Sequence, residues 1–307
     1  MTLRIGLVGI GAIARNQHAR VIAGRDDVEL VAAASRNATL DGVANHPSIE
    51  AMLDAHPEIE AVSLTAPPAP RYAMARHAIG RGKHVMLEKP PGATLSEVEE
   101  LATLARDAGV TLHATWHSRH APAIEPMRER LAGAEIRAVD CVWRESVRRW
   151  HPGQDWIWRP GGFGVLDPGI NALSILTRVL PEPFRCREAT LRVPENAQTP
   201  IAVDAQFALA SGAPLEMRLD WREEGEQVWD VTVDTDAGSL MLREGGALLL
   251  VDGEVAINEP EREYHGVYDR FVELIRTGRS EVDVSPLRHV ADVMMLGARE
   301  SVEAFEW

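Results

Sequence analysis

Small residues at positions 9–14 form a pattern whose chemistry follows from residue type and spacing. The segment reads GIGAIA and comes directly after the apolar run at 3–8. Gly9 permits a tight turn, Gly11 lets a phosphate approach the backbone, and Ala14 lets a helix sit close to the strand. The free N–H groups at the start of that helix favour an anion. Between a strand and a helix, the pattern predicts that a dinucleotide pyrophosphate is held by Gly9, Gly11, Ala12 and Ile13, with an ordinary tight turn as the alternative.

The end of the next apolar run, residues 28–34, indicates which dinucleotide is bound. An acidic residue at this point would bind the adenosine 2′-hydroxyl, but the sequence continues with Ser35 and Arg36. A serine hydroxyl and a guanidinium can both bind a 2′-phosphate. We therefore expect NADP to be preferred and NAD to be accepted, unless Arg36 is simply a solvated loop residue.

A lysine follows the fourth long strand pattern. Glu88 and Lys89 precede two prolines that end the apolar run at 83–88. Ligands of open parallel sheets bind at the carboxyl ends of the strands. Lys89 is therefore expected beside the nicotinamide, although most lysines are surface residues.

The elements that would position these residues alternate between strand and helix patterns. Strands are expected at 3–8, 28–34, 60–66, 83–88 and 110–116, and helices at 12–23, 48–55, 70–81 and 96–108. Ser96 and Glu99 are expected to form the capping box of the last helix. Such alternation predicts a parallel sheet with helices on both faces, a Rossmann-type domain over residues 1–120.

After residue 120 the pattern changes to longer strands with alternating polarity. These are expected at 136–144, 186–193, 201–209, 214–221, 227–235 and 239–243, with helices at 122–131, 166–180, 264–277 and 286–303. This pattern predicts a second α/β domain, residues 121–307, with a large and mostly antiparallel sheet.

Several longer motifs give the chain a family resemblance. These are the GIGAIA turn, Ala66-Pro67-Pro68, GKHVMLEKP at 82–90 and DPGIN at 167–171. Together they resemble the glucose–fructose oxidoreductase, inositol dehydrogenase and rhizopine-catabolism superfamily. The segments TWHSR at 115–119 and RRWHPGQ at 148–154 are similar to bacterial L-arabinose 1-dehydrogenases and D-galactose 1-dehydrogenases.

The resemblance implies oxidation of an aldopyranose at C1 to the lactone. It implies that Ala66, Pro67, Pro68, Glu88 and Lys89 contact the cofactor. It also implies a homodimer that pairs through the open sheet face, and C-terminal helices that often return to the first domain.

Three residues are candidates for the chemistry at C1, where a hydride must leave carbon and a proton must leave the hydroxyl. Asp167 and Asn171 are four apart in a predicted helix and so share a face. Many superfamily members have histidine where this chain has Asn171, and asparagine cannot act as a base at neutral pH. We expect Asp167 to be the base, Lys89 to stabilise developing negative charge and Asn171 to bind the hydroxyl. Lys89 as the base is the alternative, and Asp167 as a mere helix cap is another.

The sugar contacts are implied by the resemblance and supported by composition. The chain has eight tryptophans but only three tyrosines and five phenylalanines, and aromatic faces suit the C–H faces of a pyranose. The resemblance assigns Trp150 and Trp229 to the sugar faces, and His117, Glu145 and His151 to the sugar hydroxyls. Core packing is the alternative for each tryptophan.

Composition excludes several other classes of protein. Over 307 residues, 32 Lys and Arg face 46 Asp and Glu, a net charge of −14. We therefore expect no nucleic-acid partner. The two cysteines fit a reducing cytosol, and no signal sequence or membrane-spanning run is found. His113, His117 and His120 do not match metal-ligand spacing, so no metal is expected.

The sequence thus predicts a cytoplasmic NAD(P)-dependent aldose 1-dehydrogenase whose partner is a small sugar. Three alternatives remain at this point. They are a non-catalytic NADP-sensing regulator, an inositol-type or imino-sugar dehydrogenase, and a nicotinamide-dependent glycoside hydrolase of the same fold.

Overall fold

A computed structural model describes residues 2–307 and divides them into two compact units. The first comprises the residues up to His117 together with Tyr264–Val284. The second comprises Ser118–Glu263 and Ser285–Trp307. A boundary near residue 120 and a return of C-terminal helix to the first domain were both expected. The segment that returns is Tyr264–Val284, whereas the helix after it belongs to the second unit.

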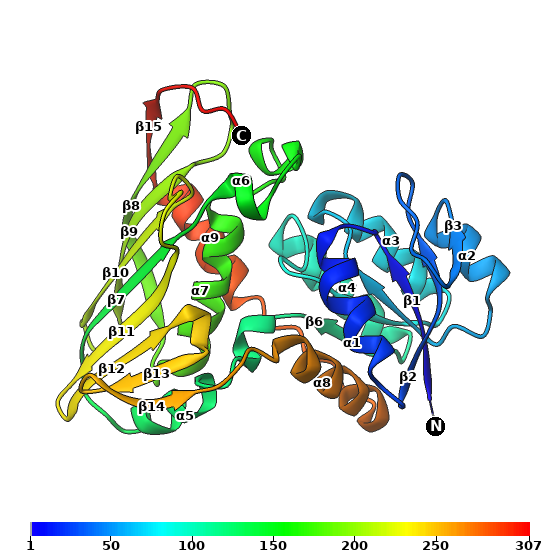
Figure 1. Cartoon of the computed structure of the whole chain (residues 1–307), viewed down its shortest axis with the longest axis horizontal. Helices are drawn as coiled ribbons and strands as arrows, with labels where there is room; N and C mark the ends of the chain where they lie inside the picture. Colours follow the sequence, from blue (N-terminus) through cyan, green and yellow to red (C-terminus); the bar gives the residue numbers. More distant parts are fainter. Residues whose placement is uncertain (1) are drawn as a thin grey trace. The chain divides into compact units, whose positions relative to one another are not determined.

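The first unit is built on a parallel sheet of six strands among the residues described, in the order β3-β2-β1-β4-β5-β6 (Figure 1). Its strands are β1 (Leu3–Val8), β2 (Val28–Ala34), β3 (Ala44–His46), β4 (Ala61–Leu64), β5 (His84–Leu87) and β6 (Leu112–Ala114). The sequence predicted all of these except β3, which is only three residues long and exposed or half-buried. The order reverses between β1 and β4, where ligands of doubly wound folds bind.

Helices cover both faces of this sheet, as expected. A π-helical turn (Ala14–His18) continues into α1 (Ala19–Ala23). The others are α2 (Ile49–Ala55), α3 (Pro68–Gly80), α4 (Leu95–Asp107) and α8 (Glu263–Thr277). Alternate residues of β5 enter different cores: Val85 and Leu87 join the core with α2, α3 and α4, and Met86 joins the core with α1 and α8.

The predicted cap of α4 was wrong. The N-cap is Thr94, whose hydroxyl accepts the N–H of Glu97, and the Glu97 carboxylate accepts the N–H of Thr94 in return. Ser96 already lies within the helix. The correct residues have the same capping-box spacing, two positions earlier.

The second unit contains a mixed sheet of nine strands within residues 2–307, in the order β14-β13-β12-β11-β7-β10-β9-β8-β15. Only β7 with β10 and β8 with β15 pair in parallel, so the prediction of a mostly antiparallel sheet is confirmed. The strands are β7 (Ile136–Arg144), β8 (Phe184–Pro194), β9 (Ala202–Leu209), β10 (Pro214–Asp220), β11 (Val228–Thr235), β12 (Gly238–Arg243), β13 (Leu248–Val251), β14 (Glu254–Asn258) and β15 (Ala298–Val302).

Helices α5 (Ile124–Leu131), α7 (Leu166–Val179) and α9 (Ser285–Leu296) lie together against this sheet (Figure 1). Helix α6 (Val147–Trp150) and the 3-10 turn Asp155–Trp158 lie in the loop after β7. The prediction of a helix to residue 303 was wrong. Helix α9 ends at Leu296, and after Gly297 the chain pairs with β8 as β15, which satisfies backbone groups at that sheet edge.

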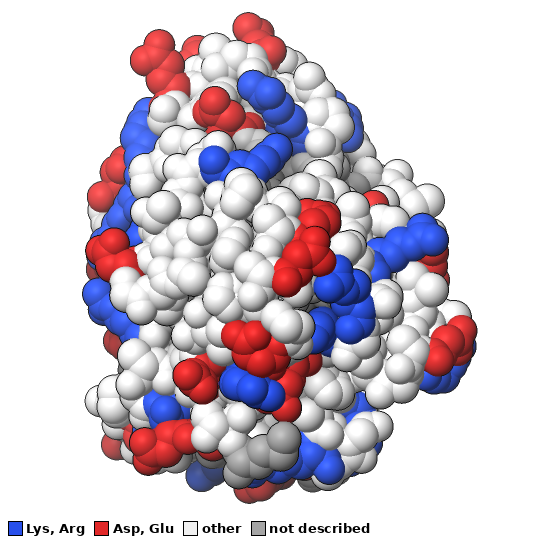
Figure 2. Space-filling model, turned by 90° about the vertical axis from the view of Figure 1, so that its right-hand side faces the viewer, with Lys and Arg blue, Asp and Glu red and all other residues white. Residues whose placement is uncertain are grey.

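Charged side chains are dispersed over the surface drawn in Figure 2, where Lys and Arg groups lie among Asp and Glu groups with uncharged residues between them. Within the described residues, no helix has the length and apolar character needed to cross a membrane.

Candidate functional site

The glycine turn has the geometry that its sequence required. Gly9 has φ +94°, and a Cβ added there would lie 2.5 Å from the backbone N of Ala66. A Cβ added at Gly11 would meet nothing within 4 Å. Gly9 is thus needed for the close approach of two backbones, and the space beside Gly11 is open. These features fit a pyrophosphate held against the turn.

The helix begins directly after this turn. Ala12 and Ile13 are helical and exposed, whereas Ala14 is fully buried against β1 and β2. First-turn N–H groups have no partner within their own helix. The backbone of Ala12 and Ile13 is therefore accessible to an anionic ligand.

Ser35 and Arg36 follow β2 at the same sheet edge. Ser35 is half-buried and donates its backbone N–H to the carbonyl of His46 at 3.0 Å. Arg36 is exposed. Their roles toward a 2′-phosphate stay a prediction.

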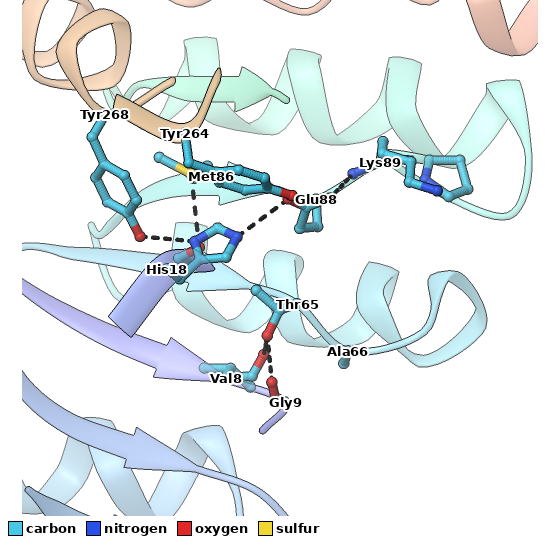
Figure 3. Close-up of polar contacts among 12 residues, drawn as sticks. Val8, Gly9, His18, Thr65, Ala66, Met86, Glu88, Lys89, Tyr264 and Tyr268 are labelled. Atoms are coloured by element: carbon cyan, nitrogen blue, oxygen red, sulfur yellow. Dashed lines mark hydrogen bonds and ion pairs between the residues drawn. The ribbon is translucent and has the colours of Figure 1, made fainter. Parts of the chain in front are cut away.

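Glu88 is the centre of a buried polar cluster beside Lys89 (Figure 3). One carboxylate oxygen accepts the Tyr264 hydroxyl at 2.7 Å and lies 3.2 Å from Nε2 of His18. The other accepts the backbone N–H of Lys89 at 2.7 Å. The other ring nitrogen of His18 lies 2.8 Å from the Tyr268 hydroxyl. The cluster connects the π-helical turn that contains His18, and helix α8, to the backbone of Lys89.

The surroundings of Glu88 strongly favour the ionised form of its carboxyl. Burial acts to raise the pKa of this carboxyl, but the hydrogen bond and charge of His18, the charge of His117 and the bond from Tyr264 together lower it to about 2. Glu88 is 4% exposed, so its carboxylate acts through the groups that it orients. Burial also raises the pKa of Tyr268, which keeps that hydroxyl protonated.

Arg71 was not predicted, yet it contacts both of the loops in which cofactor contacts are expected. This buried guanidinium on α3 donates to the carbonyls of Ala66, Glu88 and Pro90. The first of these follows β4 and the other two follow β5. Arg71 therefore links the Ala66-Pro67-Pro68 loop to the segment that carries Lys89. A lone arginine in a helix pattern gave no sequence signal for this role.

Helix α7 carries the two candidate residues of the second unit. It begins at Leu166 after an N-cap at Val165, so the alternative that Asp167 merely caps the helix is wrong. A Cβ at Gly169 would lie 2.5 Å from Leu219, which shows how closely the helix approaches β10. Asp167 is buried, Asn171 is half-buried one turn later, and Nε2 of His151 lies 3.8 Å from the Asp167 carboxylate.

Glu145 and the tryptophans form a second cluster in this unit. Nε1 atoms of Trp143 and Trp229 donate to one oxygen of Glu145, at 3.2 and 2.9 Å, and that of Trp221 donates to the other at 3.2 Å. The exposed Trp150 meets Trp229 edge to face, with ring centroids 5.6 Å apart. Trp143 and Trp221 were not among the predicted sugar contacts.

The predicted residues thus fall into two groups, one in each unit. Gly9, Gly11, Ala66, Glu88 and Lys89 line the sheet edge of the first unit, together with His117, whose ring stacks on Tyr264 at 5.3 Å. The second unit brings together Glu145, Trp150, His151, Asp167 and Trp229. Trp221 links them, because its ring lies against His151 and its N–H donates to Glu145. That the two groups meet at one substrate stays a prediction. No group of three or more metal-ligating side chains is found between residues 2 and 307.

Comparison with known proteins identifies the class. Residues 3–115 match the model of an oxidoreductase family with an NAD-binding Rossmann fold. A galactose 1-dehydrogenase of Pseudomonas fluorescens is 40% identical over 303 residues, which are 99% of this chain and 98% of that protein. This chain belongs to that oxidoreductase family, as its motifs indicated.

Solved structures agree. The crystal structure of a D-galactose-1-dehydrogenase from Rhizobium etli has a TM-score of 0.94 and 53% identity, and the match covers 99% of this chain and 98% of that one. A 3-ketoreductase from Actinomadura kijaniata, crystallised with NADP and TDP-benzene, shares the fold with a TM-score of 0.86 at 18% identity. That match covers 98% of this chain and all of the other.

Proposed function

We propose that this protein oxidises an aldopyranose, such as D-galactose or L-arabinose, at C1 to the lactone, with NAD(P) as the hydride acceptor. The observation that carries the proposal is the likeness, over nearly the whole chain, to two proteins named galactose 1-dehydrogenase. The likeness extends through the second unit, where the substrate residues are expected.

Residues of the first unit fit a dinucleotide. The open space beside Gly11 and the accessible N–H groups of Ala12 and Ile13 suit a pyrophosphate. Ser35 and the exposed Arg36 would bind a 2′-phosphate, which supports a preference for NADP with NAD also accepted. When bound, the nicotinamide supplies the acceptor for the hydride that leaves C1.

The chain's own residues must then accept the hydroxyl proton. A carboxylate at neutral pH is ready to take it, whereas lysine must first lose a proton. We assign the proton to Asp167, the stabilisation of developing negative charge to Lys89, and a hydrogen bond that fixes the hydroxyl to Asn171. His151, 3.8 Å from Asp167, would orient the carboxylate. Lys89 as the base is the alternative.

The sugar would lie between aromatic faces and polar groups. Trp150 and Trp229 would cover its C–H faces, and His117 and His151 would bind hydroxyls. D-Galactose and L-arabinose differ by one hydroxymethyl group, and such a difference is worth about 1–3 kcal/mol in a pocket. Both are therefore expected to react.

The test follows the absorbance of reduced cofactor with NADP and then NAD. The panel is D-galactose, L-arabinose, D-fucose, D-xylose, D-glucose and myo-inositol. Reduction with the first three sugars, faster with NADP, is the expected result. No reduction with any aldose despite tight NADP binding would contradict the proposal and favour the regulator.

Two variants test the assigned roles. Lys89→Met should abolish most turnover whichever residue is the base. Asp167→Asn should lower turnover by about 10²–10⁴-fold, the usual contribution of a positioned acid or base. Nearly normal turnover in Asp167→Asn would transfer the role of base to Lys89.

A homodimer and a cytoplasmic location complete the proposal. The two cysteines are free and buried, which suits a reducing compartment. Light scattering on a sizing column tests the dimer, and cell fractionation tests the location.

A further inference from the structure

Two histidine rings of the first unit face each other at the edge of its sheet. His46 is the last residue of the edge strand β3, and His56 directly follows helix α2. Their Nε2 atoms are 3.1 Å apart, and their ring centroids are 5.0 Å apart with the planes at 76°. These are not His113, His117 and His120, whose sequence spacing argued against a metal. The proposed reaction assigns no role to either ring.

The carboxylate of Glu58 determines which nitrogen of His56 faces His46. One oxygen of Glu58 lies 3.1 Å from Nδ1 of His56, and an ionised carboxylate can only accept a hydrogen bond. The pKa of Glu58 is lowered, first by a backbone hydrogen bond and then by His56. Neutral His56 therefore carries its proton on Nδ1, and its Nε2 has a free electron pair directed toward His46.

This arrangement is typical of a metal-binding histidine. Histidines that bind metals almost always donate their other ring N–H to a carboxylate, a carbonyl or water, which fixes the tautomer and makes the imidazole a better ligand. Glu58 occupies this position relative to His56. When the proton of His46 is also on Nδ1, both Nε2 atoms present electron pairs to the same point.

The distance between the two nitrogens agrees with a shared divalent ion. Zinc binds imidazole nitrogen at about 2.0–2.1 Å, so two such nitrogens in a tetrahedral site are about 3.3 Å apart. The distance in the structure, 3.1 Å, is close to this value, and both side chains are half-buried. Their partial exposure gives an ion and its water ligands access from solvent.

We propose that His46 and His56 bind a divalent transition-metal ion such as Zn²⁺ through their Nε2 atoms, with Glu58 orienting His56. Imidazole suits Zn²⁺, Ni²⁺ and Cu²⁺, whereas Mg²⁺ and Ca²⁺ prefer oxygen ligands. Two protein ligands leave the other positions of the ion to water. Without the ion, the same atoms share a hydrogen bond, in which Nε2–H of His46 donates to Nε2 of His56.

Such an ion would connect the edge strand to the helix that contacts it. Strand β3 has only three residues, and it pairs with β2 on one side. The carbonyl of His46 accepts the N–H of Ser35 at 3.0 Å, so an ion on His46 would also stabilise the position of the segment directly after β2. The inference does not depend on the proposed function, because its test measures metal binding without sugar or cofactor.

Isothermal titration calorimetry with ZnCl₂ tests the site on the full chain near neutral pH, after treatment with EDTA and its removal. We expect one ion per chain at the tightest site and no binding of Mg²⁺. His46→Asn and His56→Asn should each remove this site, because each deletes one of the two ligands. Glu58→Gln should raise the Kd for Zn²⁺ about 10–100-fold, the usual effect of losing the partner that orients a ligand.

The matched control is His265→Asn, which removes an exposed histidine of α8. This variant should bind Zn²⁺ with the affinity of the native protein. Native protein that binds no Zn²⁺ would overturn the inference. So would equal affinity in the native protein, His46→Asn and His56→Asn. In either case the pair is a hydrogen bond only.

A second readout needs no substitution in the site, so it also applies if a variant does not fold. In ¹⁵N-labelled native protein, the ring nitrogens of the histidines can be followed by NMR during the titration. One equivalent of Zn²⁺ should move the Nε2 resonances of His46 and His56 and leave those of His265 in place. Changes confined to other histidines would show that Zn²⁺ binds elsewhere and would overturn the inference.

Discussion

Replacing Glu88 by glutamine should remove a specific part of the pH dependence of stability. The pKa of this carboxyl falls from 4.5 to about 2 because His18 and Tyr264 outweigh the effect of burial. A carboxyl with a lowered pKa stabilises the fold above its unfolded pKa, and this stability is lost as the pH falls toward 2. At about 1.4 kcal/mol per pH unit, Glu88 contributes about 3 kcal/mol at pH 7.

Urea unfolding followed by tryptophan fluorescence measures this contribution. We expect Glu88→Gln to lower the free energy of unfolding by about 3 kcal/mol at pH 7. Near pH 3 the Glu88 carboxyl is mostly protonated in the unfolded chain but still largely ionised in the native protein, so the difference in unfolding free energy between the two proteins should narrow by about 2 kcal/mol.

The control is Glu99→Gln, which changes an exposed glutamate of α4. The free energy of unfolding of this variant should change with pH in the same way as that of the native protein. A gap between Glu88→Gln and native protein that stays constant from pH 7 to pH 3 would refute the reasoning, because it would mean that Glu88 titrates alike in the folded and unfolded states.

Three further substitutions and one control, Gly80→Ala, test separate features. Gly9→Ala should cost at least about 1–2 kcal/mol, because it combines a left-handed φ with a methyl 2.5 Å from the Ala66 backbone. It should also weaken NADP binding in a fluorescence titration. Gly80→Ala, whose methyl meets nothing within 4 Å, should not destabilise the protein. Thr94→Ala should lower stability by about 1 kcal/mol through the loss of an N-cap; an unchanged urea midpoint would exclude that role. Arg36→Ala should raise the Kd for NADP about tenfold or more and leave that for NAD nearly constant; equal changes for both cofactors would contradict the 2′-phosphate assignment.

The strands of the first unit other than β3 could be predicted closely because they are largely buried and consist mostly of apolar residues, whereas β3 is exposed or half-buried. The Gly9 turn could also be predicted, since only glycine accepts its φ. The cap of α4 was misplaced because Thr94 and Ser96 each begin a matching capping-box pattern. Only the backbone conformation distinguishes them. Strand β15 was missed because an edge strand takes its hydrogen bonds from a distant partner, here β8.

The candidate site also contains some residues that could be predicted from the sequence and others that could not. Lys89 and Asp167 could be selected because each stands in a local motif. The partners of Glu88 could not, since His18 and Tyr264 are separated from it by 70 and 176 residues. The three indoles around Glu145 come from β7, β11 and the end of β10, so only the strand order brings them together.

The return of Tyr264–Val284 to the first unit affects how the protein is made. Helix α8 supplies Tyr264, Val267 and Phe271 to the core that also contains Ile5 and Met86. On the ribosome, the first 117 residues emerge long before these side chains are synthesised. The dinucleotide-binding unit therefore completes its core only after the large sheet of the second unit, up to β14, has left the exit tunnel. A fragment cut after residue 117 would expose that apolar surface and lack the hydroxyl that Tyr264 donates to Glu88.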